Sequence, residues 1–401
     1  MFVWCSLWCL RYLIGGAASW NGGDLISEAK NGVVAVIIQY RLGVFGFLAG
    51  SQVKANGALN AGLLDQEFAL KWIQKHISKF GGDPDRVTIW GESAGAGSVL
   101  QHVVARDGGT NPPLFRAAMS SSSFLPSQYP FNGAVPERIF SQVVSHTGCG
   151  SASDALSCLR AVNASTLQAA NVNVSRSGFS GTYVSVPVVD GEFITQRPTQ
   201  ALRQGKVNGR ALLAVTNTNE GRNFVNQSTA TTVTASDYVL RLFPNLGDAN
   251  AATVSRLYAG IGAPIDQANA IMGESIFICP TYFMLNAFPM ASFKGEYAIP
   301  GGNHGDDVGF YFPSSRGTAF NNAAFRTSFS GAFMDFATSL DPNHKINSGN
   351  ITPLWLQHLI GHSEMLFNRT VAGKPDIRPV TSGALLQRCA FWESVGNLTA
   401  Q

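Results

Sequence analysis

One serine lies in a sequence context that suits covalent catalysis. Ser93 is the centre of the pentapeptide Gly-Glu-Ser-Ala-Gly at residues 91–95. Residues 86–90 read as a strand and residues 94–104 as a helix, so the serine falls on a sharp strand-to-helix turn that exposes its hydroxyl. Glycines two positions away on each side are needed because backbone crowds such a turn. We therefore expect Ser93 to be a nucleophile, the alternative being a serine that caps the helix.

A serine hydroxyl needs a general base, normally a histidine oriented by a carboxylate. His304 follows a predicted strand at residues 296–299 and lies in the glycine-rich loop Gly-Gly-Asn-His-Gly-Asp-Asp, which makes it the favoured base. The alternative is a histidine that only pairs with Asp306 or Asp307 in a capping turn. Of the other histidines, His76 precedes the serine and His102 falls inside the helix after it. We expect the remaining four at the surface: His146, His344, His358 and His362.

Two acidic residues compete for the role of orienting the histidine. Glu220 follows a predicted strand at residues 211–215, in Thr-Asn-Thr-Asn-Glu-Gly. Asp190 ends the apolar run Val-Pro-Val-Val and is also followed by glycine. Residue types alone favour Glu220 and leave Asp190 open, because both positions suit a turn after a strand.

The elements that would position these side chains alternate between strands and helices. The continuous apolar run at residues 33–38 is typical of a strand buried on both faces. Residues 64–80 place apolar side chains at spacings of three and four, which predicts an amphipathic helix. With the strand at 86–90 they form a βαβ unit, hence a parallel sheet with helices on its faces. Weaker helical patterns cover residues 237–243 and 323–340.

Composition narrows the class of protein. The 401 residues are 45 % hydrophobic and 13 % charged, with 28 basic against 25 acidic side chains, so no basic surface for nucleic acid is expected. The cysteines form no CxxC pair and none lies near histidines at zinc spacing, which argues against a metal site and for disulfides. Asn-x-Ser/Thr sequons favour the same secretory route; they occur at Asn163, Asn173, Asn226, Asn350, Asn368 and Asn397.

The N-terminal residues 1–18 are largely apolar and loosely resemble a signal peptide, but no basic residues precede the apolar run. Nothing else approaches the length of a membrane span, so no transmembrane segment is expected.

Several consecutive blocks resemble the type B carboxylesterase family, which includes cholinesterases and secreted fungal lipases and esterases. The blocks are Gln-Tyr-Arg-Leu-Gly-Val-Phe-Gly-Phe at 39–47, Asn-Ala-Gly-Leu-Leu-Asp-Gln at 60–66, Phe-Gly-Gly-Asp-Pro at 80–84 and Gly-Glu-Ser-Ala-Gly-Ala at 91–96. The resemblance runs from about Tyr12 to the C-terminus. It implies an α/β-hydrolase fold over residues 12–401, a mostly parallel sheet with helices on both faces, and an atypical segment at 1–11.

The resemblance also implies residue roles. Ser93, Glu220 and His304 match the family's catalytic triad, and Asp190 becomes structural. Gly181 and Tyr183 match a loop that lines the family's acyl pocket. Two disulfides are implied, Cys149–Cys158 and Cys279–Cys389, while Cys5 and Cys9 have no family counterpart.

The resemblance breaks at the N-terminus. Family members carry a His-Gly-Gly-Gly stretch whose backbone N–H groups join that of the residue after the serine, here Ala94, to form the oxyanion hole. This chain reads Trp-Cys-Leu-Arg-Tyr at 8–12 instead, so we expect it to lack the family's N-terminal part. The apolar residues 2–8 are expected to fill the sheet position between the strands at 33–38 and 86–90.

These inferences predict a secreted carboxylic ester hydrolase, a carboxylesterase or lipase, that works through an acyl-enzyme without a cofactor. Its substrate would be a small-molecule or lipid ester, and its oligomeric state is not predicted. The alternatives are a catalytically impaired fragment and a non-catalytic, cholinesterase-like binding module.

Overall fold

A mostly parallel sheet forms the centre of the molecule. The computed structural model describes the chain apart from residues 1, 7–11, 14 and 289–290. Within that part, eight strands form one sheet in the order β2-β1-β3-β4-β5-β6-β7-β8. The strands are β1 (Phe2–Ser6), β2 (Val33–Ile37), β3 (Val87–Glu92), β4 (Ala117–Ser121), β5 (Ala211–Asn217), β6 (Ser292–Tyr297), β7 (Glu364–Arg369) and β8 (Pro375–Val380). Neighbours are parallel throughout except for the antiparallel β7–β8 pair, which confirms the predicted sheet.

The N-terminal strand fills the predicted position. β1 pairs in parallel with β2 on one side and with β3 on the other. Residues 7–8 of the predicted strand lie outside the described residues. The order β2-β1-β3 therefore confirms the expected place of the segment in the sheet for residues 2–6.

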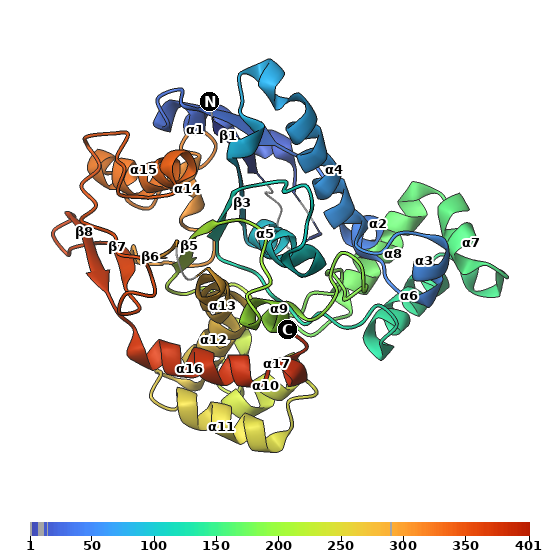
Figure 1. Cartoon of the computed structure of the whole chain (residues 1–401). Coiled ribbons are helices and arrows are strands. Elements are labelled where there is room, and N and C mark those ends of the chain that lie inside the picture. The colour runs from blue at the N-terminus through green and yellow to red at the C-terminus, as the bar shows by residue number, and fades with distance from the viewer. Residues whose placement is uncertain (1, 7–11, 14, 289–290) are drawn as a thin grey trace.

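Helices cover both faces of the sheet. They are α1 (Gly22–Glu28), α2 (Gly43–Phe47), α3 (Ser51–Asn56), α4 (Ala61–His76), α5 (Ala94–Val104), α6 (Ala134–His146), α7 (Ala155–Ala161), α8 (Ala164–Arg176), α9 (Pro198–Arg203), α10 (Ala235–Leu242), α11 (Asp248–Tyr258), α12 (Pro264–Gly273), α13 (Cys279–Ala287), α14 (Val308–Tyr311), α15 (Ala323–Ser339), α16 (Gly383–Ser394) and α17 (Gly396–Thr399). Figure 1 shows α1, α14 and α15 on one side of the sheet and α4, α5 and α13 on the other. The helices predicted at 64–80, 94–104, 237–243 and 323–340 correspond to α4 with the 3-10 turn that follows it, α5, α10 and α15.

Alternate residues of the central strands enter two separate cores. Leu212 and Ala214 of β5 point into the core beneath α5 and α13, whereas Leu213 and Val215 point into the core beneath α15. All residues of β3, β4 and β5 are buried, because helices pack on both faces. Such strands read as continuous apolar runs, which is why those at 86–90 and 211–215 were predictable.

The carboxyl ends of β3, β5 and β6 meet at one edge of the sheet, since neighbouring parallel strands end on the same side. Each of these ends leads into a loop that carries a predicted site residue: Ser93, Glu220 or His304. An isolated parallel bridge between Asn219 and Asn303 holds the last two loops side by side.

Both disulfides implied by the family resemblance are present. Cys149 is bonded to Cys158 across a separation of 9 residues, and Cys279 to Cys389 across 110 residues. The longer loop constrains the unfolded chain more strongly. The side chain of Cys5 and the whole of Cys9 lie outside what the structure describes.

Candidate active site

The backbone at Ser93 is strained in the way the turn motif predicts. Its φ of 56° and ψ of −123° lie in a region that non-glycine residues rarely adopt. The Ser93 N–H donates to the carbonyl of Ser121 at 3.0 Å, and its carbonyl accepts from the N–H of Gly97 at 2.9 Å. These bonds hold the turn between β3 and α5 with the hydroxyl at the carboxyl edge of the sheet.

Gly91 allows this turn to form. A Cβ at position 91 would lie 2.2 Å from the carbonyl carbon and oxygen of Gly95, a contact that no side chain tolerates. The requirement for glycine at the start of the pentapeptide is therefore steric, as the sequence predicts.

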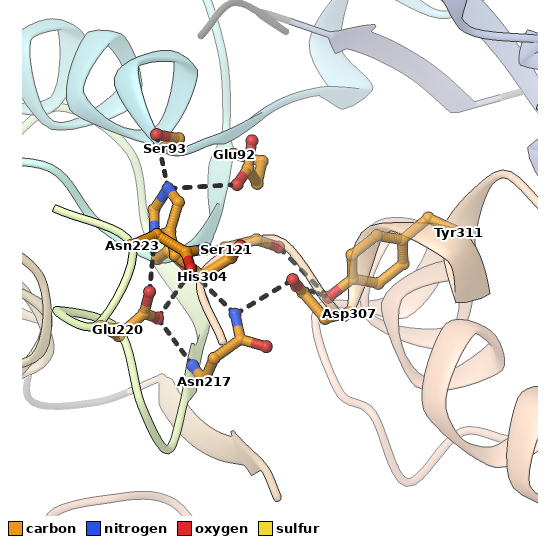
Figure 2. Close-up of polar contacts among 10 residues, drawn as sticks. Glu92, Ser93, Ser121, Asn217, Glu220, Asn223, His304, Asp307 and Tyr311 are labelled. Carbon is orange, nitrogen blue, oxygen red and sulfur yellow. Dashed lines mark hydrogen bonds and ion pairs between the residues drawn. The ribbon is translucent and has the colours of Figure 1, made fainter. Parts of the chain in front are cut away.

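His304 bridges the other two predicted residues (Figure 2). Its Nε2 lies 2.7 Å from Oγ of Ser93, and its Nδ1 lies 2.6 Å from Oε2 of Glu220. A neutral imidazole that carries its proton on Nδ1 donates to Glu220 and accepts from the Ser93 hydroxyl. Burial lowers the pKa of His304, but the charge and hydrogen bond of Glu220, together with Glu92, outweigh burial and leave the pKa raised.

Glu220 is held by groups from two strands. Its Oε1 accepts from the backbone N–H of Asn217 and from the Ser122 hydroxyl, both at 2.7 Å. Ser122 itself has a positive φ of 57°, so the residue after β4 is bent to place its hydroxyl there. The carboxylate is thus oriented on one oxygen and free to receive His304 on the other.

The alternative acid, Asp190, makes its hydrogen bonds with other residues and not with His304. Its Oδ1 accepts from the backbone N–H groups of Glu192, Phe193 and Ile194 at 2.7–3.0 Å, and its Oδ2 from the Asn60 side chain. The structure therefore places Asp190 in a buried turn, whereas Glu220 contacts His304.

Two further buried acids surround the histidine. Sequence reasoning did not single out Glu92, and it considered Asp307 only as a partner of His304 in a capping turn. Oε1 of Glu92 lies 3.5 Å from Nε2 of His304, and burial raises the pKa of Glu92 to about 8. Asp307 accepts from Asn217 at 3.1 Å and from Tyr311 at 2.9 Å, and burial raises its pKa to about 6. The signal for Glu92 was its place in the pentapeptide. The signal for Asp307 was its place in the same loop as His304. The alternative considered for His304, a capping pair with Asp306 or Asp307, does not occur. Asp306 instead accepts from the backbone N–H of Asn303 at 2.8 Å.

One histidine expected at the surface is buried, and that prediction is wrong. His358 is 1 % exposed, and its Nδ1 lies 3.3 Å from the carbonyl of Ser363. The backbone N–H of His358 donates to the carbonyl of Ser292, which holds the loop before β7 against the start of β6. Burial lowers the pKa of His358 to about 4. His146, His344 and His362 are exposed, as predicted.

Ala94 is the first residue of α5 and is fully buried beside Ser93. N–H groups in the first helical turn have no acceptor within the helix, so they are available to an oxyanion. Residues 8–11, where the resemblance to the family breaks, lie outside the described residues.

Gly181 and Tyr183 line a cavity of about 380 Å³ beside the site, together with Phe179, Val186 and Ile276. Gly181 has a φ of +96°, and a Cβ there would lie 2.9 Å from both Met272 Cε and the Phe224 carbonyl oxygen. The loop therefore requires glycine at this point.

Aromatic rings connect the cavity to the histidine. The rings of Tyr183 and Phe224 have centroids 5.9 Å apart, and the ring of Phe224 lies 4.9 Å from that of His304. Apolar side chains thus extend from the imidazole to the cavity wall.

Among the described residues, no cluster of three or more His, Cys, Asp or Glu could hold a metal ion. In the same part of the chain, no helix combines the length and apolarity that crossing a membrane requires.

A parallel sheet with helices on both faces and a serine on a strand-to-helix turn are two marks of an α/β-hydrolase. The third is a histidine that contacts both the serine and an acid, with the chain order serine, acid, histidine, as in Ser93, Glu220 and His304. Residues 10–392 match the carboxylesterase family, and the chain belongs to that family.

Several similar proteins come from fungi. Lipase 4 of Diutina rugosa is 32 % identical over 373 residues, covering 83 % of this chain and 66 % of the relative. Secreted lipase 1 of Botryotinia fuckeliana is 40 % identical over 204 residues, covering 48 % of this chain and 35 % of the relative. The crystal structure of EstA from Aspergillus niger matches with a TM-score of 0.86 and 30 % identity, over 100 % of this chain and 81 % of that one. This chain spans 66 % and 65 % of the length of two Diutina lipases, just under two thirds.

Proposed function

We propose that this chain is a serine hydrolase that cleaves carboxylic esters through an acyl-enzyme intermediate. The observation that carries the proposal is the unbroken chain of hydrogen bonds from Ser93 Oγ through His304 to Glu220, at 2.7 and 2.6 Å. Family membership and the esterase and lipase relatives support the same reaction class.

In the first step, Ser93 Oγ attacks the ester carbonyl while Nε2 of His304 takes the hydroxyl proton. Glu220 holds the imidazole by its Nδ1–H and stabilises the positive ring. His304 then passes the proton to the leaving alcohol. In the second step, water attacks the acyl-enzyme with His304 again as base, and the acid is released. None of these steps needs a cofactor.

The Ala94 N–H would donate one hydrogen bond to the oxyanion, because it opens α5 beside the reacting serine. The positive end of the helix dipole points to the same place and stabilises negative charge there.

The cavity lined by Gly181 and Tyr183 would receive the acyl group. Its volume of about 380 Å³ and apolar lining suit a chain longer than acetyl. Val186→Trp would fill it, and we expect this variant to lose activity on long p-nitrophenyl esters at least about tenfold more than on the acetate. Equal losses on both would contradict an acyl role for the cavity.

The test of the reaction is direct. Purified chain is incubated with a p-nitrophenyl ester and, separately, with a fluorophosphonate probe. We expect turnover and labelling by the natural chain and neither by Ser93→Ala, whose fold is checked by circular dichroism.

Other outcomes identify the alternatives. Labelling without turnover would indicate an impaired oxyanion hole, and a folded chain with neither signal would indicate a non-catalytic binding module. Either outcome contradicts the proposal.

We also propose that the protein is extracellular and glycosylated. Two disulfides and the secreted lipases of Botryotinia fuckeliana and Gibberella zeae among its relatives support this location.

A further inference from the structure

A π-helical turn, η7 (Glu274–Ile278), joins α12 to α13 beside the candidate active site. Its defining bond runs from the N–H of Cys279 to the carbonyl of Glu274, five residues earlier. All five residues of η7 are buried. Such turns are rare, and they occur often at functional sites because they re-aim side chains on a helix.

The π turn persists because its carbonyls are bonded outside the helix. The carbonyl of Ser275 accepts from the side chain of Gln401 at 2.8 Å. The carbonyl of Ile276 accepts from the N–H of Leu125, four residues after β4, at 2.9 Å. In a regular α-helix the Ile276 carbonyl would have no donor, because residue 280 is proline and has no N–H. The contacts with Leu125 and Gln401 satisfy the two carbonyls from outside the helix, so the wider turn leaves neither of them unpaired.

The side chain that the π turn directs at the site is Phe277. Its ring is fully buried, and its centroid lies 4.5 Å from that of His304 at an interplanar angle of 48°. Phe224 stacks on Phe277 at 5.1 Å and contacts the same imidazole at 4.9 Å. Two phenyl rings therefore close the apolar side of the histidine.

Both ends of η7 are tied to α16. At its start, Glu274 accepts two hydrogen bonds from the Arg388 guanidinium at 2.7 Å and one from the Tyr258 hydroxyl at 2.6 Å. Immediately after its end, Cys279 is bonded to Cys389. These ties use consecutive residues of α16, so η7 cannot shift along its axis unless α16 moves with it.

We propose that η7, tied to α16 at both ends, positions the general base, and that Phe277 is the positioning residue through which it acts on His304. The inference rests on the proposed function. The phenyl ring excludes water from one face of the imidazole and leaves Nε2 directed at Ser93 Oγ. The titratable groups facing the imidazole lie outside η7, namely Glu92 at the end of β3, Glu220 after β5 and Asp307 in the histidine's own loop.

Shortening Phe277 tests the contact. We expect Phe277→Ala to lower kcat about tenfold or more with little change in KM, and Phe277→Leu to recover part of the loss. Water reaching the imidazole weakens the burial that lowers its pKa, so the acidic limb of the kcat/KM profile moves to higher pH in Phe277→Ala. Phe325→Leu is the matched control, because Phe325 is equally buried in the core on the other side of the sheet. An unchanged kcat and limb in Phe277→Ala would overturn the proposal.

Removing the Cys279–Cys389 disulfide tests whether the connection between η7 and α16 affects His304. The double variant Cys279→Ala/Cys389→Ala is compared with Cys149→Ala/Cys158→Ala, which removes the disulfide in another core cluster. Both are assayed at temperatures where the chain stays folded. We expect only the first to lower kcat and shift the acidic limb. If both double variants changed kcat and the acidic limb equally, the Cys279–Cys389 disulfide would only stabilise the fold, and the proposal would be contradicted.

A measurement without turnover separates this inference from the proposed function. The pKa of the His304 imidazole is read by NMR titration of histidine-labelled chain, with His304→Gln to assign the signal. A higher pKa in Phe277→Ala than in the natural chain supports the positioning role even where Ser93 turns over no ester. An identical pKa contradicts it even in an active enzyme.

Discussion

At the scale of single residues, the site depends on a histidine surrounded by carboxyl groups that are not equivalent. Glu220 accepts from Asn217, Ser122 and His304, so its negative charge is satisfied on both oxygens. Oε1 of Glu92 has no hydrogen-bond partner among the described residues, and burial keeps this side chain protonated at neutral pH, with a pKa of about 8. One acid thus orients the imidazole of His304, while the other lies beside its Nε2 in neutral form.

Glu92→Gln should broaden the acidic side of the activity profile. An ionised Glu92 raises the pKa of His304, and glutamine of the same shape cannot ionise. Because Glu92, with a pKa of about 8, is mostly neutral below pH 7, we expect the acidic limb of kcat/KM to move to lower pH by only about a few tenths of a unit, with kcat near pH 8 within several-fold of the natural chain. A pH series with a p-nitrophenyl ester measures the shift, and a limb that moves upward would refute this account of Glu92.

The sequons differ in access to modification. Asn350 is 4 % exposed and its side-chain amide donates to Asp335 at 3.0 Å, whereas Asn163 is exposed in a turn closed by the N–H of Ser165 at 2.9 Å. In chain secreted from a fungal host, we expect a glycan on Asn163 and none on Asn350. Peptide mass spectrometry after enzymatic deglycosylation reports both sites in one sample, and occupancy at Asn350 would contradict its buried position.

At the scale of elements, the strands and the helix that position Ser93 and Glu220 follow from local patterns. β3, β5 and α5 are apolar runs or amphipathic repeats, and their predicted ranges agree with the structure to within two residues at most ends. β4 was not predicted, because Ala-Ala-Met-Ser-Ser has little β-branched character and forms a strand only between β3 and β5. The antiparallel β8 depends on its pairing with β7 in the same way.

Glycine substitutions test the turn between β3 and α5. Gly91→Ala places a Cβ 2.2 Å from the backbone of Gly95, so we expect at least about 3 kcal/mol of destabilisation, or no folded product. Gly260→Ala, where no atom lies within 4 Å of the added Cβ, should change the free energy of unfolding by less than about 0.5 kcal/mol. Denaturant unfolding compares the two, and a Gly91→Ala chain as stable as Gly260→Ala would refute the steric argument.

At the scale of the whole molecule, the sheet separates two cores and brings loops distant in sequence to one edge. The residues that meet at this edge are 84 to 211 positions apart, as for His304 with Glu220 and with Ser93. The same packing buries ionisable groups on both sides, and their pKa values couple the stability of the fold to pH.

Stability should fall as the pH rises from about 6.5 to 8. Glu92 keeps its proton up to a pKa of about 8 when folded but loses it near 4.5 when unfolded, so ionisation favours the unfolded chain. His304 acts in the same direction, because its pKa is raised above 6.5 and the stability from its charged form is lost with increasing pH. We expect a slope of about 1.4 kcal/mol per pH unit for each group that releases a proton.

Urea unfolding at several pH values measures this slope. Glu92→Gln should flatten it, since only His304 then remains of the two groups. A slope that Glu92→Gln leaves unchanged would place the responsible group elsewhere.

The sequence by itself predicted the candidate nucleophile, the class of fold and the disulfide framework. These depend on neighbours along the chain or on blocks shared with the family: glycines around Ser93, apolar runs before each loop, and cysteines that match a known pattern. Residue types alone left Glu220 and Asp190 open and the family resemblance favoured Glu220, but only the tertiary structure shows which of the two contacts His304. Each ends an apolar segment and precedes glycine, but β5 pairs with β6 and so brings Glu220 to His304, while Asp190 accepts from its own turn. The placement of Glu92 and Phe277 against the histidine likewise depends on strand order and on a π turn, which arise from contacts between residues far apart in sequence.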